Sequence, residues 1–226
     1  ISFTSRFLEN GMRLYSNDYP EKHEVKAKDI VIATRQQSEN MPILGYPAMI
    51  PSYLEKESLI VASNLYRVEN NSNLSNEIIY QLLRSTNYLE HIKLNTKGTT
   101  VGMITKDAVE DFYFNLPSIE LISKLHIELK SIVDLIFIKR NEIKKLIELK
   151  EILQENSHRE VIGCFCIASN VSGIITPYEE ISKLLKHYGA KVLFDAAASS
   201  PYMNVPCHLY DALVLSPHKL LGGPGS

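Results

Sequence analysis

The sequence predicts two pieces of different fold class in one chain: a mixed α+β domain that ends in a long coiled-coil-type helix, and a truncated α/β fragment built on a parallel sheet. Three observations predict this. Residues 1–116 alternate short β-rich runs with polar loops, residues 118–155 contain no Gly or Pro, and residues 156–226 alternate apolar strands with a helix. We therefore divide the chain into domains at 1–116, 117–155 and 156–226.

Two apolar runs bounded by polar residues predict strands in the first piece. They lie at Lys28–Arg35 and Glu57–Ser63, and both are rich in Ile, Val and Ala. A short helix is expected at Asn76–Ser85, where Ile and Leu recur at helical spacing. The first piece is therefore expected to mix strands and helices.

A long helix is expected after Pro117, with Ser118 as its N-cap. It would cover roughly 35 residues, or about 50 Å at the rise of an α-helix. A helix of this kind either packs along its own domain or pairs with a partner helix, and the length favours a coiled-coil arm. The predicted seam follows alternating steps of three and four, with Lys139 and Lys150 at two of its positions and apolar residues at the others: Ile122, Leu125, Leu129, Ile132, Ile136, Ile143, Leu146 and Leu153.

The last piece has the order strand, helix, strand, strand. Apolar strands are expected at Val161–Ala168, Lys191–Asp195 and Asp211–Ser216. Thr176–Glu179 has the pattern of a capping box that opens a helix, and Gly189 is suited to end that helix. Strands separated by a helix predict parallel β-α-β pairing, in which ligands bind at the carboxyl ends of the strands.

The bulk composition excludes several classes of protein. The net charge is -2 at pH 7, so DNA binding would need a local basic patch. No apolar run is long enough to span a membrane, and no secretion leader is visible at the start of the sequence. Cys164, Cys166 and Cys207 do not have the spacing of a disulfide framework or of a metal site. We expect these cysteines to be reduced and in or near the core of a cytoplasmic protein.

Three segments near the predicted strand ends carry groups suited to an aldehyde cofactor. They are Ala168–Gly173, Phe194–Pro201 and Ser216–Gly225. Such a cofactor needs a lysine to form an imine, a carboxylate for the ring nitrogen, and hydroxyl or imidazole donors for the phosphate. In this order, the three segments resemble the class V aminotransferases, a family with the type I pyridoxal-phosphate fold that includes the cysteine desulfurases.

The resemblance implies a cofactor and a role for each matching residue. Lys219 would form the imine with pyridoxal phosphate and would carry the proton in catalysis. Asp195 would pair with the ring nitrogen, and Asn170 would lie near the ring hydroxyl. Ser216 and His218 would hold the phosphate.

The match departs from the family pattern in two respects. Many members have Gln three residues after the aspartate, where this sequence has Ala198, which puts desulfurase activity in doubt. The family also has an upstream stacking ring and phosphate loop and a downstream substrate arginine, and no pattern for these is visible here. We therefore expect no catalysis by this chain alone.

Residues 20–155 show a second, looser resemblance. It rests on Val25–Arg35, Ile60–Arg67, Gly98–Ile104 and Phe114–Pro117, followed by the long helix. These features resemble one half of a type I restriction-modification specificity subunit, in which a target recognition domain precedes a spacer helix.

That resemblance implies DNA binding without catalytic residues of its own. The partners would be DNA, the methyltransferase and restriction subunits, and a second half that pairs through the helix at 118–155. Arginine, glutamine and asparagine read base edges, whereas lysine and threonine contact phosphates. The candidate DNA-binding residues are Arg35, Gln36, Gln37, Lys93, Lys97, Thr99 and Thr100.

The leading hypothesis is sequence-specific DNA recognition by half of a specificity subunit fused to an incomplete pyridoxal-phosphate domain. One alternative is a class V aminotransferase or cysteine desulfurase-like enzyme fragment with an unusual N-terminal extension. The other is a non-functional chimera whose parts fold poorly.

Overall fold

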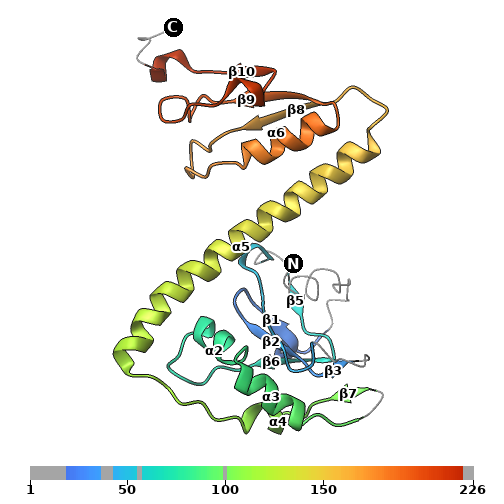
Figure 1. Cartoon of the computed structure of the whole chain (residues 1–226), viewed down its shortest axis with the longest axis vertical. Helices are drawn as coiled ribbons and strands as arrows, with labels where there is room; N and C mark the ends of the chain where they lie inside the picture. Colours follow the sequence, from blue (N-terminus) through green and yellow to red (C-terminus); the bar gives the residue numbers. More distant parts are fainter. Residues whose placement is uncertain (1–18, 37–42, 55–57, 99–100, 221–226) are drawn as a thin grey trace. The chain divides into compact units, whose positions relative to one another are not determined.

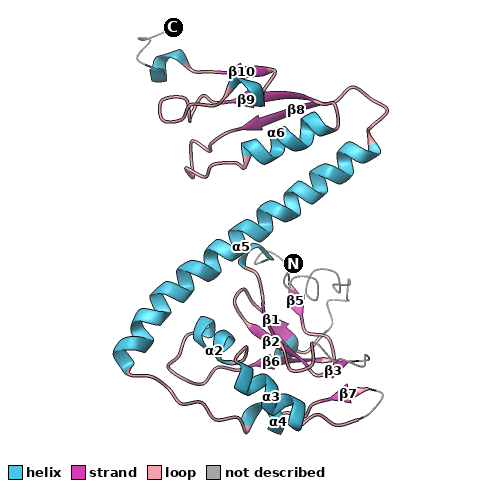
Figure 2. Cartoon of the chain, viewed as in Figure 1, coloured by secondary structure: helices cyan, strands magenta, loops and turns pink. Residues whose placement is uncertain are grey.

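A computed structural model of the chain describes residues 19–36, 43–54, 58–98 and 101–220. The chain divides into two compact units, Ile1–Lys139 and Arg140–Ser226. Figure 1 shows the order of the elements along the chain, and Figure 2 shows where helices and strands fall.

The N-terminal unit is centred on β2 (Ile30–Ala33), an apolar strand whose four residues are all buried. It pairs antiparallel with β4 (Pro47–Met49) on one side and with β6 (Leu65–Val68) on the other. Burial on both faces explains why β2 is continuously apolar rather than alternating.

Two further antiparallel pairs border this sheet. β1 (Glu24–Val25) pairs with β5 (Leu59–Ile60), and β3 (Arg35–Gln36) pairs with β7 (Gly102–Met103). Besides the long helix, the other elements among the described residues of the unit are η1 (Glu21–His23), η2 (Ser52–Leu54), α2 (Asn76–Leu82), α3 (Thr86–Leu94) and α4 (Asp107–Glu110). Together they enclose a core that includes Ile32, Tyr88 and Ile92. The predicted mixture of strands and helices is confirmed for this unit.

An ion-pair cluster connects three elements of the N-terminal unit. Lys28 Nζ lies 3.2 Å from Glu77 Oε1 on α2 and 2.7 Å from Asp134 Oδ1 on the long helix. Lys28 has a φ of 68°, a left-handed conformation that is uncommon for residues other than Gly, Asn and Asp. Asn76 Nδ2 also donates to the Lys28 carbonyl at 3.1 Å. These contacts hold the β1–β2 turn in a conformation that its sequence does not favour.

The long helix α5 (Ile119–Glu155) has 37 residues, and Ser118 Oγ accepts a hydrogen bond from the Leu121 N–H at its start. The predicted helix and its cap are therefore confirmed. Val133 and Phe137 are buried in the core of the N-terminal unit, whereas Leu153 is buried in the C-terminal core.

The predicted seam of α5 describes how the helix packs within this chain only in part: the seam residue Leu153 is buried in the C-terminal core, whereas other seam residues are exposed. Ile132, Ile136 and Ile143 are 53%, 43% and 57% exposed. The helix buries Val133 and Phe137 instead, because α2 and α3 present their apolar residues to that face. Pairing with a partner helix through residues 118–155 remains a prediction.

The C-terminal unit contains the predicted parallel sheet. β8 (Ile162–Cys166), β9 (Lys191–Asp195) and β10 (Ala212–Val214) lie in the order β10-β9-β8, with β9 in the centre and both pairings parallel. α6 (Tyr178–His187) covers one face of this sheet through Ile181 and Leu185. The predicted parallel α/β fragment is therefore confirmed for these residues.

Of the two predictions for the ends of α6, the one for its C-terminal end is confirmed and the one for its N-terminal cap is wrong. Gly189 has a φ of 72° just after the helix, as expected for a helix-ending glycine. The predicted capping box is wrong, because no side chain caps the first turn and α6 begins at Tyr178. Thr176 Oγ1 instead donates to the Cys166 carbonyl at 2.7 Å, which ties the loop before α6 to the end of β8.

The expectation that the cysteines lie in or near the core is also wrong, because Cys164, Cys166 and Cys207 are all exposed and free. Alternate residues of a strand face opposite sides of a sheet. Gly163 faces α6, so Cys164 and Cys166 face the opposite, exposed side. The apolar surroundings in the sequence therefore did not indicate burial.

Candidate functional site

The carboxyl ends of the three parallel strands meet at one edge of the C-terminal sheet. Cys166 on β8, Asp195 on β9 and Val214 on β10 are aligned by the strand register. The backbone ladder continues one step further, since the Ile167 N–H donates to Asp195 O and the Ala196 N–H donates to Val214 O, both at 2.9 Å. Polar residues that follow these strands therefore leave the sheet along the same edge.

Asp195 is the last residue of the central strand and is half-buried. Its Oδ1 accepts a hydrogen bond from the Ala197 N–H at 2.8 Å. Its Oδ2 lies 3.7 Å from Cys166 Sγ, which is within the range of a weak thiol hydrogen bond. These two contacts orient the carboxylate, and each oxygen retains a lone pair for a further donor.

The lysine and the proposed phosphate ligands follow β10. Ser216 is half-buried, and η4 (Pro217–Leu220) carries His218 and Lys219. Ser216 Oγ lies 3.1 Å from His218 Nδ1, and the Lys219 N–H donates to Ser216 O at 2.9 Å. The tight turn therefore joins a hydroxyl, an imidazole and an amine in four consecutive positions.

Asn170 follows β8 in a turn and is exposed. The turn is stabilised by Ser169, whose Oγ accepts the N–H groups of Val171 and Ser172 at 3.3 and 3.1 Å. Asn170 thus lies on the β8 side of Asp195, while the Ser216–Lys219 turn lies on the β10 side. The strand order places the five predicted cofactor residues along one edge of the sheet.

The side chains at this edge fit the chemistry of pyridoxal phosphate. The Asp195 carboxylate can accept a hydrogen bond from the protonated nitrogen of a pyridine ring, and the Lys219 amine is a nucleophile for an aldehyde. Ser216 and His218 offer donors for phosphate. Asn170, His218 and Lys219 are nevertheless exposed, so the described residues form an open ledge rather than an enclosed pocket.

Cys166 is a neighbour of Asp195 that the sequence did not predict. Both positions are final residues of adjacent parallel strands, and that alignment follows from the register rather than from a local motif. The two predicted runs, Val161–Ala168 and Lys191–Asp195, differ in length and give no register, so the sequence carried no signal for this contact.

The second set of predicted residues lies in the N-terminal unit. Arg35 pairs with Met103 across β3 and β7, and Lys97 forms an isolated bridge with Met103 on its other side. The structure therefore brings the predicted residues Arg35 and Lys97 to one surface. Lys93 is exposed on α3, and Gln37, Thr99 and Thr100 lie outside the described residues.

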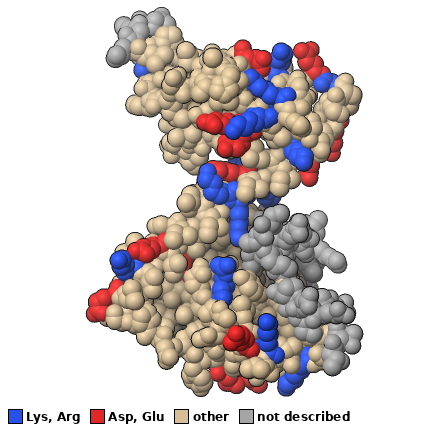
Figure 3. Space-filling view, in the orientation of Figure 1, with Lys and Arg blue, Asp and Glu red and all other residues tan. Residues whose placement is uncertain are grey.

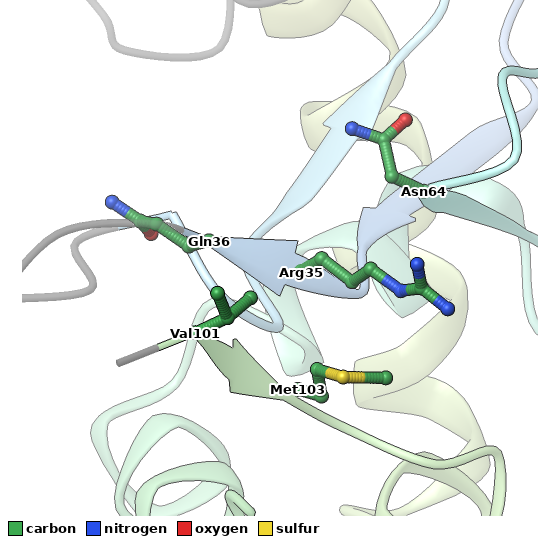
Figure 4. Close-up of a pocket in the computed structure, with 5 residues that line it drawn as sticks. All are labelled: Arg35, Gln36, Asn64, Val101 and Met103. Atoms are coloured by element: carbon green, nitrogen blue, oxygen red, sulfur yellow. The ribbon is translucent and has the colours of Figure 1, made fainter. Parts of the chain in front are cut away.

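The Gln36 side chain stabilises the backbone at Ile43 and Leu44. Its side-chain oxygen accepts the N–H groups of Ile43 and Leu44 at 2.7 and 3.1 Å. Gln36 also lines a pocket with Arg35, Asn64, Val101 and Met103 (Figure 4). Asn64 was not predicted, because the pairing that brings it near Arg35 is long-range.

Comparison with known proteins supports the C-terminal assignment. The sequence model described as aminotransferase class-V matches residues 121–226. This segment is similar to the class V aminotransferases. The match begins inside α5. It therefore includes residues 121–155, which the sequence-based division placed before the C-terminal piece at 156–226.

Curated relatives point in the same direction. A cysteine desulfurase from Synechococcus elongatus is 40% identical over 81 residues, which cover 35% of this chain and 13% of that protein. A probable cysteine desulfurase from Synechocystis sp. is 42% identical over 59 residues, covering 25% of this chain and 14% of the relative. A probable cysteine desulfurase from Aeropyrum pernix is 33% identical over 79 residues, covering 34% and 18%. The chain therefore spans less than a fifth of the length of these relatives.

Pyridoxal phosphate is the cofactor of class V aminotransferases and cysteine desulfurases, so the cofactor class expected for the C-terminal segment agrees with its relatives. These findings favour the alternative of a class V fragment over the leading hypothesis of DNA recognition. They give no support to the resemblance of residues 20–155 to specificity subunits. Within the described residues, no helix combines the length and apolar character needed to cross a membrane.

Proposed function

We propose that the C-terminal unit supplies the lysine-bearing edge of a pyridoxal-phosphate site in a class V aminotransferase-like or cysteine desulfurase-like protein. The observation that carries the proposal is the alignment of three strand ends. Asp195 ends the central strand, and the Ser216–Lys219 turn follows its neighbour β10. Two chemically distinct cofactor contacts are thus held on adjacent, hydrogen-bonded strands.

Each residue has a separate task in this proposal. Lys219 binds the cofactor covalently and holds or releases a proton at its amine. Asp195 keeps the ring nitrogen protonated, and Ser216 and His218 hold the phosphate. When bound, pyridoxal phosphate supplies a ring that accepts electrons from the substrate.

We do not expect turnover by this chain alone. Exposed Asn170, His218 and Lys219 leave the site open to water, whereas catalysis at such a site depends on excluded solvent and fixed orientation. Ala198 stands where many family members have glutamine, so the proposal includes both transamination and desulfuration as reaction types.

Titration of the full chain with pyridoxal phosphate tests this function. The visible absorbance of the lysine adduct should saturate in the unaltered chain and be lost in Lys219→Ala. Lys183→Ala is the matched control, since Lys183 is an exposed lysine on α6 of the same unit. Equal adduct in Lys219→Ala and the unaltered chain would overturn the proposal.

A second candidate function is DNA binding by the N-terminal unit. The observation that favours it is the β3–β7 ribbon, which carries Arg35 beside Met103 and Lys97. A two-stranded ribbon can enter a DNA major groove, where arginine recognises guanine. Partnership with methyltransferase and restriction subunits, and dimerisation through residues 118–155, belong to this candidate.

On the face drawn in Figure 3, Lys and Arg side chains are interspersed with Asp and Glu side chains. Binding to short duplexes at several salt concentrations tests the candidate. If the N-terminal unit binds DNA, we expect preference for one sequence and a salt-dependent affinity that Arg35→Ala reduces. Uniform weak binding that Arg35→Ala leaves unchanged would contradict DNA recognition by this unit.

A further inference from the structure

Three exposed side chains stand in a row across the edge of the N-terminal unit. The register pairs Arg35 with Met103, and the bridge pairs Met103 with Lys97. Residues directly opposite one another in a sheet project from the same face. The row is therefore a methionine flanked by two cations, and Met103 is 40% exposed.

The two cations have no other electrostatic role within the described parts of the chain. Neither the Arg35 guanidinium nor the Lys97 ammonium has a hydrogen-bond or ion-pair partner there. By contrast, Arg67 on neighbouring β6 lies 3.2 Å from Asp29. Arg35 and Lys97 are thus available to an external anion.

A pocket of about 540 Å³ adjoins Arg35, lined also by Gln36, Asn64, Val101 and Met103. Figure 4 shows the Arg35 side chain between those of Asn64 and Met103. Backbone hydrogen bonds fix this order, since the Thr34 N–H donates to Asn64 O at 2.9 Å and the Ile104 N–H donates to Thr34 O at 3.0 Å. The pocket wall is therefore built on ladder contacts of the sheet.

The lining combines a cation, an amide and apolar surface. Arginine binds phosphate through paired N–H donors, and the thioether of methionine packs well against aromatic rings. Asn64 can both donate to and accept from a polar ring edge. A volume of this size lies within the range of pockets for small molecules, roughly 300–1,000 Å³.

We propose that this pocket binds a mononucleotide, a phosphate joined to a flat heteroaromatic ring. Arg35 binds the phosphate, Lys97 adds positive charge on the other side of Met103, Val101 and Met103 pack against the ring, and Asn64 contacts its polar edge. The pocket suits one nucleotide better than a duplex, because Arg35 is the one cation among its described lining residues. The proposal does not depend on either function above, and all of its residues belong to the N-terminal unit.

Calorimetric titration of the full chain with GMP and AMP tests the proposal. We expect saturable binding of at least one of them, weakened at least tenfold by Arg35→Ala and less by Arg35→Lys, which keeps the charge but loses the paired donors. Lys22→Ala removes an exposed cation on η1 of the same unit and should leave binding unchanged. Circular dichroism and the melting temperature establish that each variant remains folded.

Three further titrations separate the competing ligands. Guanosine and adenosine report on the ring contact, and inorganic phosphate reports on the anion contact alone. We expect each part to bind more weakly than the nucleotide. Phosphate binding as tightly as GMP and AMP would overturn the proposal in favour of a simple anion site. Binding of a short duplex at Arg35 without mononucleotide binding, or no binding of either nucleotide, would also overturn it.

Discussion

Cys166 Sγ lies 3.7 Å from Asp195 Oδ2, because the two residues are paired at the ends of adjacent parallel strands. The Ala197 N–H donates to the other carboxylate oxygen at 2.8 Å. The carboxylate proposed to pair with a cofactor ring is therefore oriented from two sides before any ligand binds. Strand register, rather than residues near Asp195 in sequence, supplies the thiol contact.

Asp195→Asn should weaken binding of pyridoxal phosphate while leaving the fold intact. A neutral amide cannot hold the ring nitrogen protonated, and loss of a hydrogen bond to a charged group costs about 1.5–3 kcal/mol, or about tenfold to a hundredfold in affinity. Absorbance titration measures the change. Glu179→Gln neutralises an exposed carboxylate on α6 and should have no effect. Equal weakening by both substitutions would argue against a specific role for Asp195.

Gly163→Ala should destabilise the C-terminal unit. A Cβ at this position would lie 2.5 Å from Leu185 Cδ1, and Leu185 is fully buried between α6 and the sheet. Overpacking a buried contact costs about 1–3 kcal/mol. Chemical denaturation followed by circular dichroism measures the free energy of unfolding. Cys164→Ala, one residue along on the exposed face, should change that free energy little.

Tyr88→Phe should stabilise the N-terminal unit or leave its stability unchanged. Tyr88 is fully buried, its hydroxyl has no hydrogen-bond partner among the described residues, and burial raises the pKa of this phenol. Leaving a buried polar group unpaired costs about 1–3 kcal/mol, so removing the hydroxyl relieves that cost. The edge-on contact with the Phe112 ring, 5.5 Å between centroids, is retained. Chemical denaturation measures the free energy of unfolding. A large decrease of that free energy in Tyr88→Phe would show that the hydroxyl has a hydrogen-bond partner.

The stability of the N-terminal unit should fall in acid because of Glu77. Burial alone would raise the pKa of Glu77, but a backbone hydrogen bond and Lys28 outweigh burial and hold that pKa below its ordinary value of 4.5. A carboxylate with a lowered pKa contributes stability above the pKa of the unfolded chain, and this is lost as the pH falls through the folded pKa. The loss should therefore begin near pH 4.5 and continue below it.

Glu77→Gln isolates this contribution. The variant should be less stable at neutral pH by about 2 kcal/mol, because Lys28 loses a buried partner, and should lose less stability on acidification. Glu128→Gln, on an exposed position of α5, is the control. An acid loss of the same size in Glu77→Gln as in the unaltered chain would assign the pH dependence to other carboxylates.

The sequence was most informative where local signals and burial agree. β8, β9 and α5 were predicted because their apolar patterns are uninterrupted, and Gly189 because glycine readily adopts the left-handed conformation that the end of a helix needs, as the structure confirms. The five cofactor residues were predicted by resemblance, and the strand order places them along one edge.

The features that the sequence predicted wrongly or missed depend on contacts between residues that are distant in sequence. Thr176 has the sequence of a cap but donates to the Cys166 carbonyl, a contact that no local pattern specifies. The cysteines alternate with residues that face α6, so an apolar neighbourhood in sequence does not give them burial. The pocket beside Arg35 depends on pairing with Met103, far along the chain, and the sequence gives no register for such short strands.

Reductive trapping identifies the lysine that binds pyridoxal phosphate. The full chain is incubated with limiting pyridoxal phosphate, reduced with borohydride and digested, and the modified lysine is identified by mass spectrometry. We expect the label to be concentrated on Lys219 and to be reduced by Asp195→Asn or by an excess of inorganic phosphate. A label spread evenly over exposed lysines such as Lys183 and Lys219, unaffected by either change, would show that the Lys219 edge is not a cofactor site.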